Sequence, residues 1–577
     1  MDTHRPGLQV LFLVSAHNGL SQRVRIALED LGHTVAVAVV DSAEAMEAAV
    51  SRHRPELIVC PMLKSIIPES IFARHRCLIV HPGPTGDRGP SSLDWAIELG
   101  SEAWGVTVLE ATAAVDGGDV WATRAFPTRR TGKSSLYRHE VRHAAVDAVV
   151  QAVTQIAGGR TTPAPPDEAD LRVTGRLRPL LTQTERAIDW TRDPTAKVLR
   201  RIRAAEGHPG LLDEIRGAPF HLFGGHDEGR LRGVPGELVA QRHGAVCRAT
   251  ADGAVWISHL KAPGGYKLPA VRALALAGVE VDVPEVPAAL QAPRESHTTF
   301  REIVYDERRG VGYLAFEFYN GAMSTDQCRR LLDAYRHATA RRETDVIVLM
   351  GGRDFFSNGI HLNVIEAAED PAGESWLNLH AIDDLVQEIA ETETHLTIAA
   401  LSGDAAAGGV PLALAADQVL ARQDVVLNPY YGHMGGLYGS EYWTYLLPRR
   451  VGAAVAAELT SPPFEALGSR RAVELRLLDD AFGGTAECFR AGVREIAERL
   501  SGRGVAAALV GKRRARRRDE RVKPLSEYRR EELARSHDCF FGGPPAYHQA
   551  RHRFVHKLGA PCSVTPAAAA EPQLSAR

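Results

Sequence analysis

The spacing of hydrophobic and polar positions differs between regions of the chain, and the spacing in the first region predicts a parallel α/β fold. Continuous apolar runs predict strands at 8–14, 34–40, 57–59 and 77–80. Helical spacing at 22–31, ended by Gly32, and at 42–51 predicts helices between them. Continuous apolar strands are typical of a sheet that is buried on both faces. Their alternation with helices therefore predicts a Rossmann-like α/β sheet.

A second region has shorter strands and more turn residues. Asp193-Pro194 predicts a helix start, with a capping Asp and Pro at the first helical position. Short strands at 236–241, 246–250 and 255–259 predict a small, OB-like β-barrel. Segments rich in Pro with Gly and Thr (158–169) or Ala and Val (275–295) predict linkers on either side.

A third region begins near Phe300, with buried strands predicted at 346–350 and 397–401, each followed by a Gly-rich turn. The C-terminal part is helical and carries the basic run 512–518. Such a run is usually a solvated helix face, and contact with a phosphate-bearing ligand or an acidic partner is the alternative. We predict domains at 1–165, 166–285 and 296–577.

Composition limits the kinds of partner and the cellular compartment that the sequence predicts. The 577 residues are 45% hydrophobic and 24% charged, with a net charge of −3, so no global charge suggests nucleic acid or an anionic membrane as a partner. The seven cysteines are scattered and none forms a CxxC, which predicts reduced thiols in a cytoplasmic protein. No apolar run is long enough to predict a membrane span, and no metal site is predicted.

The first chemical motif follows the fourth predicted strand. It consists of Ile79-Val80-His81-Pro82, Arg88-Gly89-Pro90 and Val115-Asp116-Gly117-Gly118-Asp119. Active residues of parallel sheets lie just past the carboxyl ends of the strands, where His81 stands. A histidine can shuttle a proton, and a carboxylate such as Asp116 can fix its tautomer. A lone histidine is nevertheless more often structural, so this chemistry alone does not decide the role.

Residues 81–97 and 105–119, with Ile188-Asp189-Trp190, resemble formyltransferases that use 10-formyltetrahydrofolate, including methionyl-tRNA formyltransferase. The resemblance covers about 8–263. It implies catalytic roles for His81 and Asp116, and it places Met62, Leu63 and Arg88 near the folate. Most of that family has Asn at the position of Ile79, where it donates to the formyl oxygen. Losing such a donor typically costs a few kcal/mol of transition-state stabilisation, which puts the family's usual amine acceptors in doubt.

A second motif comprises Phe356-Ser357-Asn358-Gly359-Ile360, Ala407-Gly408-Gly409 and Pro429-Tyr430-Tyr431. It resembles the crotonase (enoyl-CoA hydratase/isomerase) superfamily over about 300–557. The resemblance implies that the backbone N–H groups of Ile360 and Gly408 clasp a thioester oxygen. Flanking glycines allow that close approach.

The usual hydratase carboxylates are missing, because their positions match Pro411 and Tyr431. Hydration of a double bond is therefore not expected. The Tyr-rich segment 428–443 contains Glu441. Two interpretations stay open for it: aromatic packing around a Gly-rich loop, or a replacement acid/base set made by Tyr431 and Glu441.

The two motifs in one chain resemble a family of hydrogenase maturation factors. That resemblance implies transfer of formyl from 10-formyltetrahydrofolate to coenzyme A, followed by decarbonylation of formyl-CoA. By the same resemblance, the carbon monoxide is expected to become a ligand of the [NiFe]-hydrogenase iron. The implied partners are these small molecules and maturation proteins that handle the iron centre. Because helix N-termini and arginine favour phosphates, we expect coenzyme A contacts at Ser21, Gln22, Arg138, Arg551 and Arg553.

Two alternatives remain at this point. One is a bifunctional hydrolase of formyl-folate and CoA thioesters, since the missing carboxylates argue against hydration but not against hydrolysis. The other is a CoA-binding assembly scaffold without activity, against which the intact His81 and Asp116 weigh.

Overall fold

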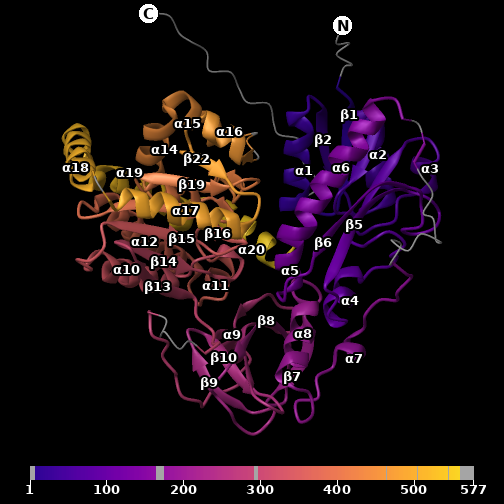
Figure 1. Cartoon of the computed structure of the whole chain (residues 1–577), viewed down its shortest axis with the longest axis horizontal. Helices are drawn as coiled ribbons and strands as arrows, with labels where there is room; N and C mark the ends of the chain where they lie inside the picture. The colour runs from indigo at the N-terminus through magenta and orange to yellow at the C-terminus, as the bar shows by residue number, and fades with distance from the viewer. Residues whose placement is uncertain are drawn as a thin grey trace, which may run out of the picture.

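The computed structural model describes residues 7–160, 162–163, 175–291 and 297–558, apart from residues 463, 465, 503 and 544. Three units meet in the chain (Figure 1): an N-terminal α/β unit, a small β unit and a larger C-terminal α/β unit. Among the described residues, no helix is both long and apolar enough to cross a membrane. The six described cysteines are free thiols.

The first unit is built on a six-stranded sheet of order β2-β1-β3-β4-β5-β6. The four predicted strands are present and parallel: β1 (Gln9–Val14), β2 (Thr34–Val39), β3 (Leu57–Cys60) and β4 (Cys77–His81). The sheet is extended at one edge by two strands that were not predicted, β5 (Ala103–Glu110) and β6 (Val120–Pro127), and β5 runs antiparallel to both β4 and β6. A hairpin needs no crossover helix, and the spacing of 103–127 leaves no room for one.

Both faces of this sheet are covered. Val10, Phe12 and Val14 pack against α1 (Gly19–Asp30) and α6 (Arg142–Ala157), while Leu11 and Leu13 pack against α2 (Ala43–His53). Helix α1 begins before its predicted start because the Asn18 side chain accepts the Ser21 N–H. The remaining helices of the unit are α3 (Glu69–Phe72), α4 (Ser92–Glu98), α5 (Lys133–Leu136) and a π-helical turn, η1 (Tyr137–Val141), that runs into α6.

The second unit is the small OB-like part. Its antiparallel sheet has the order β7-β8-β11-β10-β9, with β12 paired to β11. The strands are β7 (Leu211–Ile215), β8 (Ala218–Glu228), β9 (Leu238–Arg242), β10 (Ala245–Ala249), β11 (Ala254–Lys261) and β12 (Leu268–Pro269). The helices are α7 (Gln183–Arg186), α8 (Thr195–Ala205) and α9 (Ala270–Leu276).

Two predictions for this unit need correction. Asp193 does not cap α8, which begins at Thr195 after Pro194. Its carboxylate instead accepts the Asp189 N–H and pairs with Lys197 and Arg201, so it closes the preceding turn. The predicted linker 275–295 starts inside α9, and most of the predicted linker 158–169 lies outside the described residues.

The third unit contains two sheets, and the chain alternates between them. One has the order β13-β14-β15-β17-β19-β22 and the other β16-β18-β20-β21. The large-sheet strands β15 (Val346–Met350), β17 (Leu396–Leu401) and β19 (Gln418–Arg422) are each followed by a small-sheet strand, β16 (Phe355–Ser357), β18 (Asp404–Ala406) and β20 (Val426–Asn428). In each of these three strand pairs the chain leaves the large sheet and adds a strand to the small sheet, which gives a spiral of β-strands. The other strands are β13 (Ile303–Arg308), β14 (Val311–Phe316), β21 (Leu467–Gly468) and β22 (Asp480–Phe482).

Helices surround these sheets and supply most of the largest core cluster. They are η2 (Tyr319–Gly321), α10 (Thr325–Thr339), α11 (Leu362–Glu366), α12 (Pro371–Glu391), α13 (Gly409–Leu414), α14 (Trp443–Val451), α15 (Ala453–Leu459), α16 (Ser469–Glu474), α17 (Ala486–Leu500), α18 (Val505–Val522), α19 (Leu525–Phe541) and α20 (Ala546–His556). The basic run lies on α18, where Arg514, Arg517 and Arg518 are exposed, as expected for a solvated face. Lys512 differs, since its ammonium donates to Asp417.

Candidate functional site

The first predicted site lies at the carboxyl end of β4, where His81 is the last residue of the strand. The side chain is buried between two carboxylates. Its Nε2 is 2.9 Å from Asp87 Oδ2, and its Nδ1 is 3.5 Å from Asp116 Oδ2. The predicted pair of His81 and Asp116 is therefore brought together, and a second acid joins it. An imidazole between two carboxylates is suited to take up and release a proton.

Asp87 was not among the predicted residues. Its other oxygen pairs with Arg178, which reaches back from the segment that follows the first unit. Gly83 makes the approach possible, because a Cβ there would lie 2.5 Å from His81 Nε2 and 2.4 Å from Asp87 Oδ2. The available signal in the sequence was the position of Asp87 directly before Arg88-Gly89-Pro90.

Asp116 stands in the loop between β5 and β6 with a left-handed backbone, φ +52°. Its Oδ2 accepts the Gly89 N–H at 3.2 Å. Asp116 therefore links its own loop to the Arg88-Gly89 turn beside His81.

The predicted folate residues lie along the same edge of the sheet. The Met62 carbonyl, just after β3, accepts the Ser15 N–H at 2.8 Å. Leu63 packs in the cluster that also contains Ile79. Arg88 is half-buried, with Nη1 near Gly117. Because β3 and β4 are parallel neighbours, the carboxyl end of β3 brings Met62 and Leu63 to the same edge of the sheet as His81.

The second predicted site lies deep in the third unit. The buried Tyr431 hydroxyl donates to Glu441 Oε2 at 2.8 Å, and the Ser440 N–H donates to the same oxygen at 2.9 Å. Glu441 is 1% exposed and has a left-handed backbone, φ +62°. A non-glycine residue in this conformation, with its side chain turned inward, is typical of functional turns. The two predicted acid/base residues are therefore in direct contact.

The predicted oxyanion amides flank this pair. Ile360 follows β16, and Gly408 is the cap residue of α13. A Cβ on Gly408 would lie 2.2 Å from Glu441 Oε1, and one on Gly359 would lie 3.1 Å from the Gly408 nitrogen. The two Gly turns and the carboxyl group of Glu441 thus converge, and the first amides of α13 have no partner within the helix.

Two further buried acids hold the backbone of the turn that carries Glu441, and sequence reasoning missed both. Asp383 on α12 accepts the Glu441 N–H and the Ser440 hydroxyl, each at 2.7 Å. Glu532 on α19 accepts the Tyr442 N–H at 2.8 Å. Both come from the interior of long helices, where a single acid gives no signal of its own.

Burial controls the protonation of these acids. Burial, and then the charge of Asp383, raise the pKa of Glu441 to about 8. Burial raises the pKa of Glu532 to about 8 and that of Asp383 to about 6. Burial and the adjacent Glu441 hold the pKa of Tyr431 well above its usual value. Near neutral pH, Glu441 can therefore take up or release a proton, while Tyr431 remains a hydrogen-bond donor.

The residues predicted to contact coenzyme A are spread over two places. Ser21 is fully buried, and its hydroxyl donates to the Asn18 carbonyl. Gln22 donates to the His17 carbonyl at 3.3 Å. Arg138 binds Asp354 Oδ2 at 2.8 Å, at the boundary of the first and third units.

The C-terminal candidates lie on α20. Arg551 donates to Glu366 Oε2 on α11 at 2.8 Å, and Arg553 is half-buried. Ser21, Gln22, Arg138 and Arg551 thus already hold protein groups, and Arg553 is not free of partners either. Any phosphate would have to compete with those contacts or share them.

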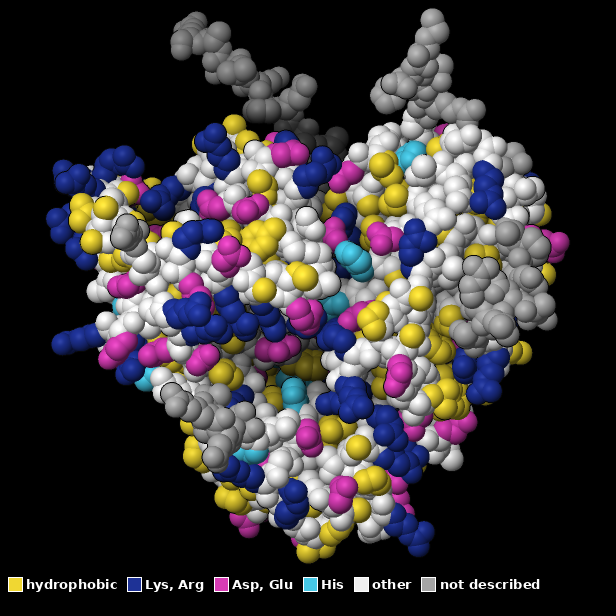
Figure 2. Space-filling model, viewed as in Figure 1, with side chains coloured by type: hydrophobic (Ala, Val, Ile, Leu, Met, Phe, Trp, Pro, Cys, Tyr) yellow, Lys and Arg dark blue, Asp and Glu magenta, His cyan; other side chains and the backbone are white. Residues whose placement is uncertain are grey.

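A cavity of about 220 Å³ opens where the three units meet. Ser135 and Arg138 line it from the first unit, His259 from the second, and Tyr319 and Asp354 from the third. Figure 2 shows basic and histidine side chains around this hollow. The cavity is open to groups from both halves of the chain.

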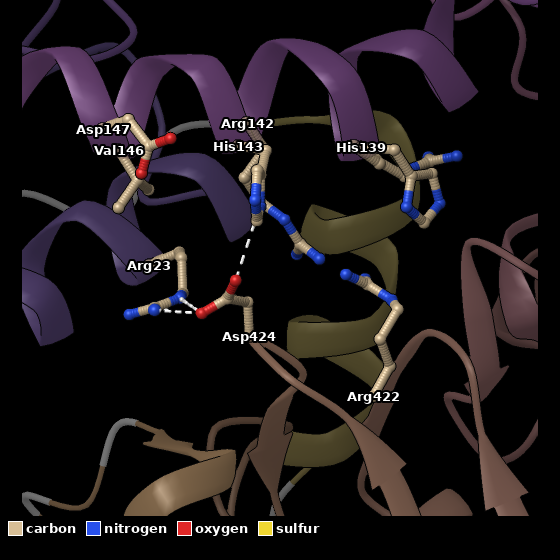
Figure 3. Close-up of a pocket in the computed structure, with 9 residues that line it drawn as sticks. Arg23, His139, Arg142, His143, Val146, Asp147, Arg422 and Asp424 are labelled. Carbon is tan, nitrogen blue, oxygen red and sulfur yellow. Dashed lines mark hydrogen bonds and ion pairs between the residues drawn. The ribbon is translucent and has the colours of Figure 1, made fainter. Parts of the chain in front are cut away.

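A smaller cavity lies between α1, α6 and the β19–β20 turn (Figure 3). Arg23 and His143 contact Asp424 there, and Arg422 points toward Arg142 across the boundary of the units. Arg138 also lines this cavity, so it borders both.

Comparisons with known proteins match this arrangement. The formyl transferase family matches residues 8–153, its C-terminal domain residues 180–276, and the enoyl-CoA hydratase/isomerase family residues 310–464. Hydrogenase maturation factor HoxX of Bradyrhizobium diazoefficiens is 46% identical over 97% of this chain and 96% of its own length. The chain belongs to the HypX (HoxX) family of hydrogenase maturation factors.

A crystal structure of HypX from Aquifex aeolicus in complex with tetrahydrofolic acid has the same overall fold. It is 41% identical, with a TM-score of 0.91, and covers 96% of this chain and 97% of its own. Methionyl-tRNA formyltransferase of Ralstonia nicotianae is 27% identical over 38% of this chain. Membership of the HypX family confirms the predicted fusion of a formyltransferase part with a crotonase-like part.

Proposed function

We propose that this HypX-family protein makes carbon monoxide for the iron of a [NiFe]-hydrogenase in two steps. Formyl passes from 10-formyltetrahydrofolate to the thiol of coenzyme A, and the resulting formyl-CoA is decarbonylated. The observation that carries the proposal is the buried contact of Tyr431 with Glu441 beside Gly408, in the same chain as a histidine–carboxylate site of formyltransferase type.

The first step is assigned to His81. The coenzyme A thiol loses its proton as sulfur attacks the formyl carbon, and the folate nitrogen gains a proton as the C–N bond breaks. The imidazole accepts the first proton and supplies the second, while Asp116 and Asp87 stabilise its charged form. The side chain of Ile79 offers no hydrogen bond to the formyl oxygen.

The second step is assigned to Tyr431 and Glu441. The Ile360 and Gly408 amides would hold the thioester oxygen. Glu441 takes the formyl proton, the electron pair of the C–H bond stays on carbon, and the C–S bond breaks to give carbon monoxide and a thiolate. Tyr431 then donates its proton to sulfur and recovers one from Glu441, which restores both groups. Formyl-CoA thus yields carbon monoxide and coenzyme A without an oxidant.

Coenzyme A has a long flexible arm, which suits transfer between two sites. We assign its phosphates to the Ser21-Gln22 turn, Arg138 and the C-terminal cations Arg551 and Arg553. The cavity lined by all three units supports passage of the arm across the boundary near Arg138.

The proposal is tested by supplying the full chain with 10-formyltetrahydrofolate and coenzyme A and trapping carbon monoxide with a haem protein. We expect equal amounts of tetrahydrofolate and carbon monoxide. Formate in place of carbon monoxide would identify a hydrolase, and binding of coenzyme A without any product would identify a scaffold. Either result would overturn the proposal.

A further inference from the structure

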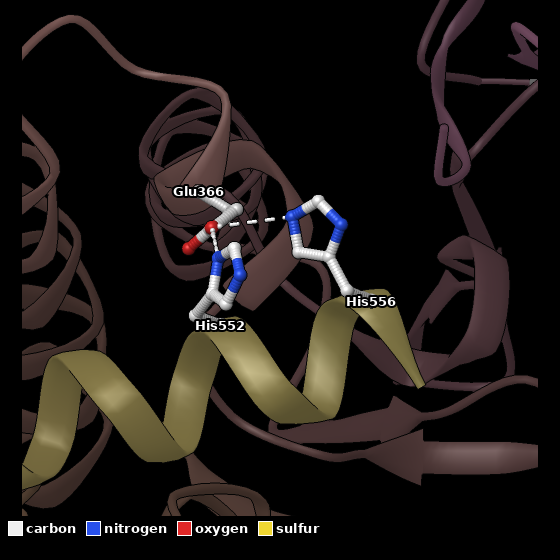
Figure 4. A group of neighbouring side chains, drawn as sticks. All are labelled: Glu366, His552 and His556. Carbon is white, nitrogen blue, oxygen red and sulfur yellow. Dashed lines mark hydrogen bonds and ion pairs between the residues drawn. The ribbon is translucent and has the colours of Figure 1, made fainter. Parts of the chain in front are cut away.

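The C-terminal helix α20 places two histidines against a partly buried glutamate of α11 (Figure 4). His552 Nδ1 is 2.6 Å from Glu366 Oε1, and His556 Nε2 is 3.4 Å from the same oxygen. One ligand atom from each of the three side chains lies within 4.8 Å of the other two. The predicted first and second sites include none of these residues.

The geometry is that of a ligand set. Residues four apart on a helix lie on the same face, so His552 and His556 present their rings together. Two imidazoles and one carboxylate suit a borderline divalent ion, which binds nitrogen and oxygen at about 2.0–2.2 Å. Ligand atoms around such an ion are separated by only a few ångström, so small ring rotations would bring all three into its shell.

The carboxylate is also held in position. Arg551 donates to Glu366 Oε2 at 2.8 Å, which leaves Oε1 on the histidine side. Groups that orient a ligand in this way are typical of metal sites. The side chain of Glu366 is 10% exposed and that of His552 is 52% exposed, so the carboxylate side of the site is shielded from solvent and the His552 side is open to it.

We propose that Glu366, His552 and His556 bind one divalent ion of the zinc, nickel or cobalt class, with a further coordination position open to solvent. The ion would join α20 to α11, the helix that follows the Ile360 turn. His556 also packs edge-on against Tyr266 of the second unit at 4.9 Å between ring centroids, so the bound ion would fix the C-terminal helix where these units meet. The inference does not depend on the carbon monoxide chemistry proposed above.

The test uses the full chain, stripped with a chelator, and Zn²⁺ in competition with a chromogenic chelator. We expect one tight site per chain, which the His552→Ala/His556→Ala variant weakens at least a hundredfold, since loss of an outer partner alone typically weakens metal sites 10–100-fold. The matched control is His53→Ala, an exposed helical histidine of α2 far from α20 in sequence, which should bind Zn²⁺ as the unmodified chain does.

Co²⁺ gives a second measurement, because a site with imidazole and carboxylate ligands produces visible absorption that the double variant should lose. Melting curves without metal separate misfolding from ligand loss, and Glu366→Gln, which keeps the shape of the side chain, should also weaken binding. Equal Zn²⁺ affinity and equal Co²⁺ spectra in the unmodified chain and a folded double variant would overturn the site and leave the cluster as an ion-pair network.

Discussion

The two candidate sites use carboxylates in opposite ways. At the first site, positive or chargeable groups alternate with acids: Arg178 binds Asp87, and His81 lies between Asp87 and Asp116. At the second, Glu441, Asp383 and Glu532 are all buried in the core, and Arg529 lies 3.8 Å from Asp383. At the second site, burial raises the pKa of Glu441 and that of Glu532 to about 8. The first site therefore places its carboxylates against a histidine and an arginine, whereas the second gathers acids whose pKa is raised by burial.

The largest effect is expected from a variant that inactivates the first site alone. His81→Ala should lower formyl transfer by about a hundredfold or more, because it removes the proton shuttle. The measurement is tetrahydrofolate release in the presence of coenzyme A. Carbon monoxide release from supplied formyl-CoA should be unchanged, and His53→Ala should affect neither reaction. Normal tetrahydrofolate release by a well-folded His81→Ala protein would remove His81 from the mechanism.

The converse change breaks the second site alone. Tyr431→Phe and Glu441→Gln should each lower carbon monoxide release by roughly a hundredfold while formyl transfer continues. Each removes one hydroxyl or one ionisable group with little change of volume, so packing should be kept. Tetrahydrofolate and carbon monoxide are followed separately in one reaction. Carbon monoxide at the unmodified rate in both variants would make Tyr431 and Glu441 packing residues.

A smaller effect concerns the support of Glu441. Asp383→Asn should lower carbon monoxide release by about tenfold or less and move its pH profile to lower pH, since the charge of Asp383 raises the pKa of Glu441. The matched control is Asp384→Asn, whose side chain is half exposed and pairs with Arg529. An unshifted profile in Asp383→Asn would show that the two acids are not coupled in the reaction.

The smallest effect is on stability. The pKa of Glu441 rises from an ordinary 4.5 to about 8 on folding, so between these values the folded chain holds a proton that the unfolded chain has released. This contribution to stability is complete below about pH 4.5 and is lost as pH rises toward 8. Glu441→Gln cannot lose that proton. Its Tm should therefore rise relative to the unmodified chain, by a few degrees, between pH 5 and pH 8. A constant difference in Tm would contradict the raised pKa.

The sequence predicted the elements whose hydrophobic spacing is strong. The first four strands of the N-terminal sheet, and β15 and β17, appear close to their predicted positions. The antiparallel edge of the first sheet was missed, because apolar spacing predicts a strand but not its direction. Asp193 failed as a helix cap because its carboxylate accepts the Asp189 N–H of the preceding turn and pairs with Lys197 on α8.

For the sites, local motifs predicted residues that lie near one another in sequence or at strand ends. Tyr431 and Glu441 were predicted as a pair and are hydrogen-bonded. Contacts across long separations were not predicted: Arg178 with Asp87, Glu532 with Tyr442, and Glu366 with the α20 histidines. The His552–His556 spacing was visible in the sequence, but its carboxylate partner was not.

By itself, the sequence determined the family, the order of the fused parts and the positions where backbone groups must come close. Glycine stands at these positions, 83, 359 and 408, for two reasons. A Cβ at 83 or 408 would collide with neighbouring atoms, and at 359 a side chain would be strained by the left-handed backbone. The tertiary structure decided the surroundings of each acid. Glu441 and Asp87 are both acids in their local sequence, and only folding buries one among carboxylates and places the other between a histidine and an arginine. The pKa of a group depends on its surroundings in space, and those are assembled from distant parts of the chain.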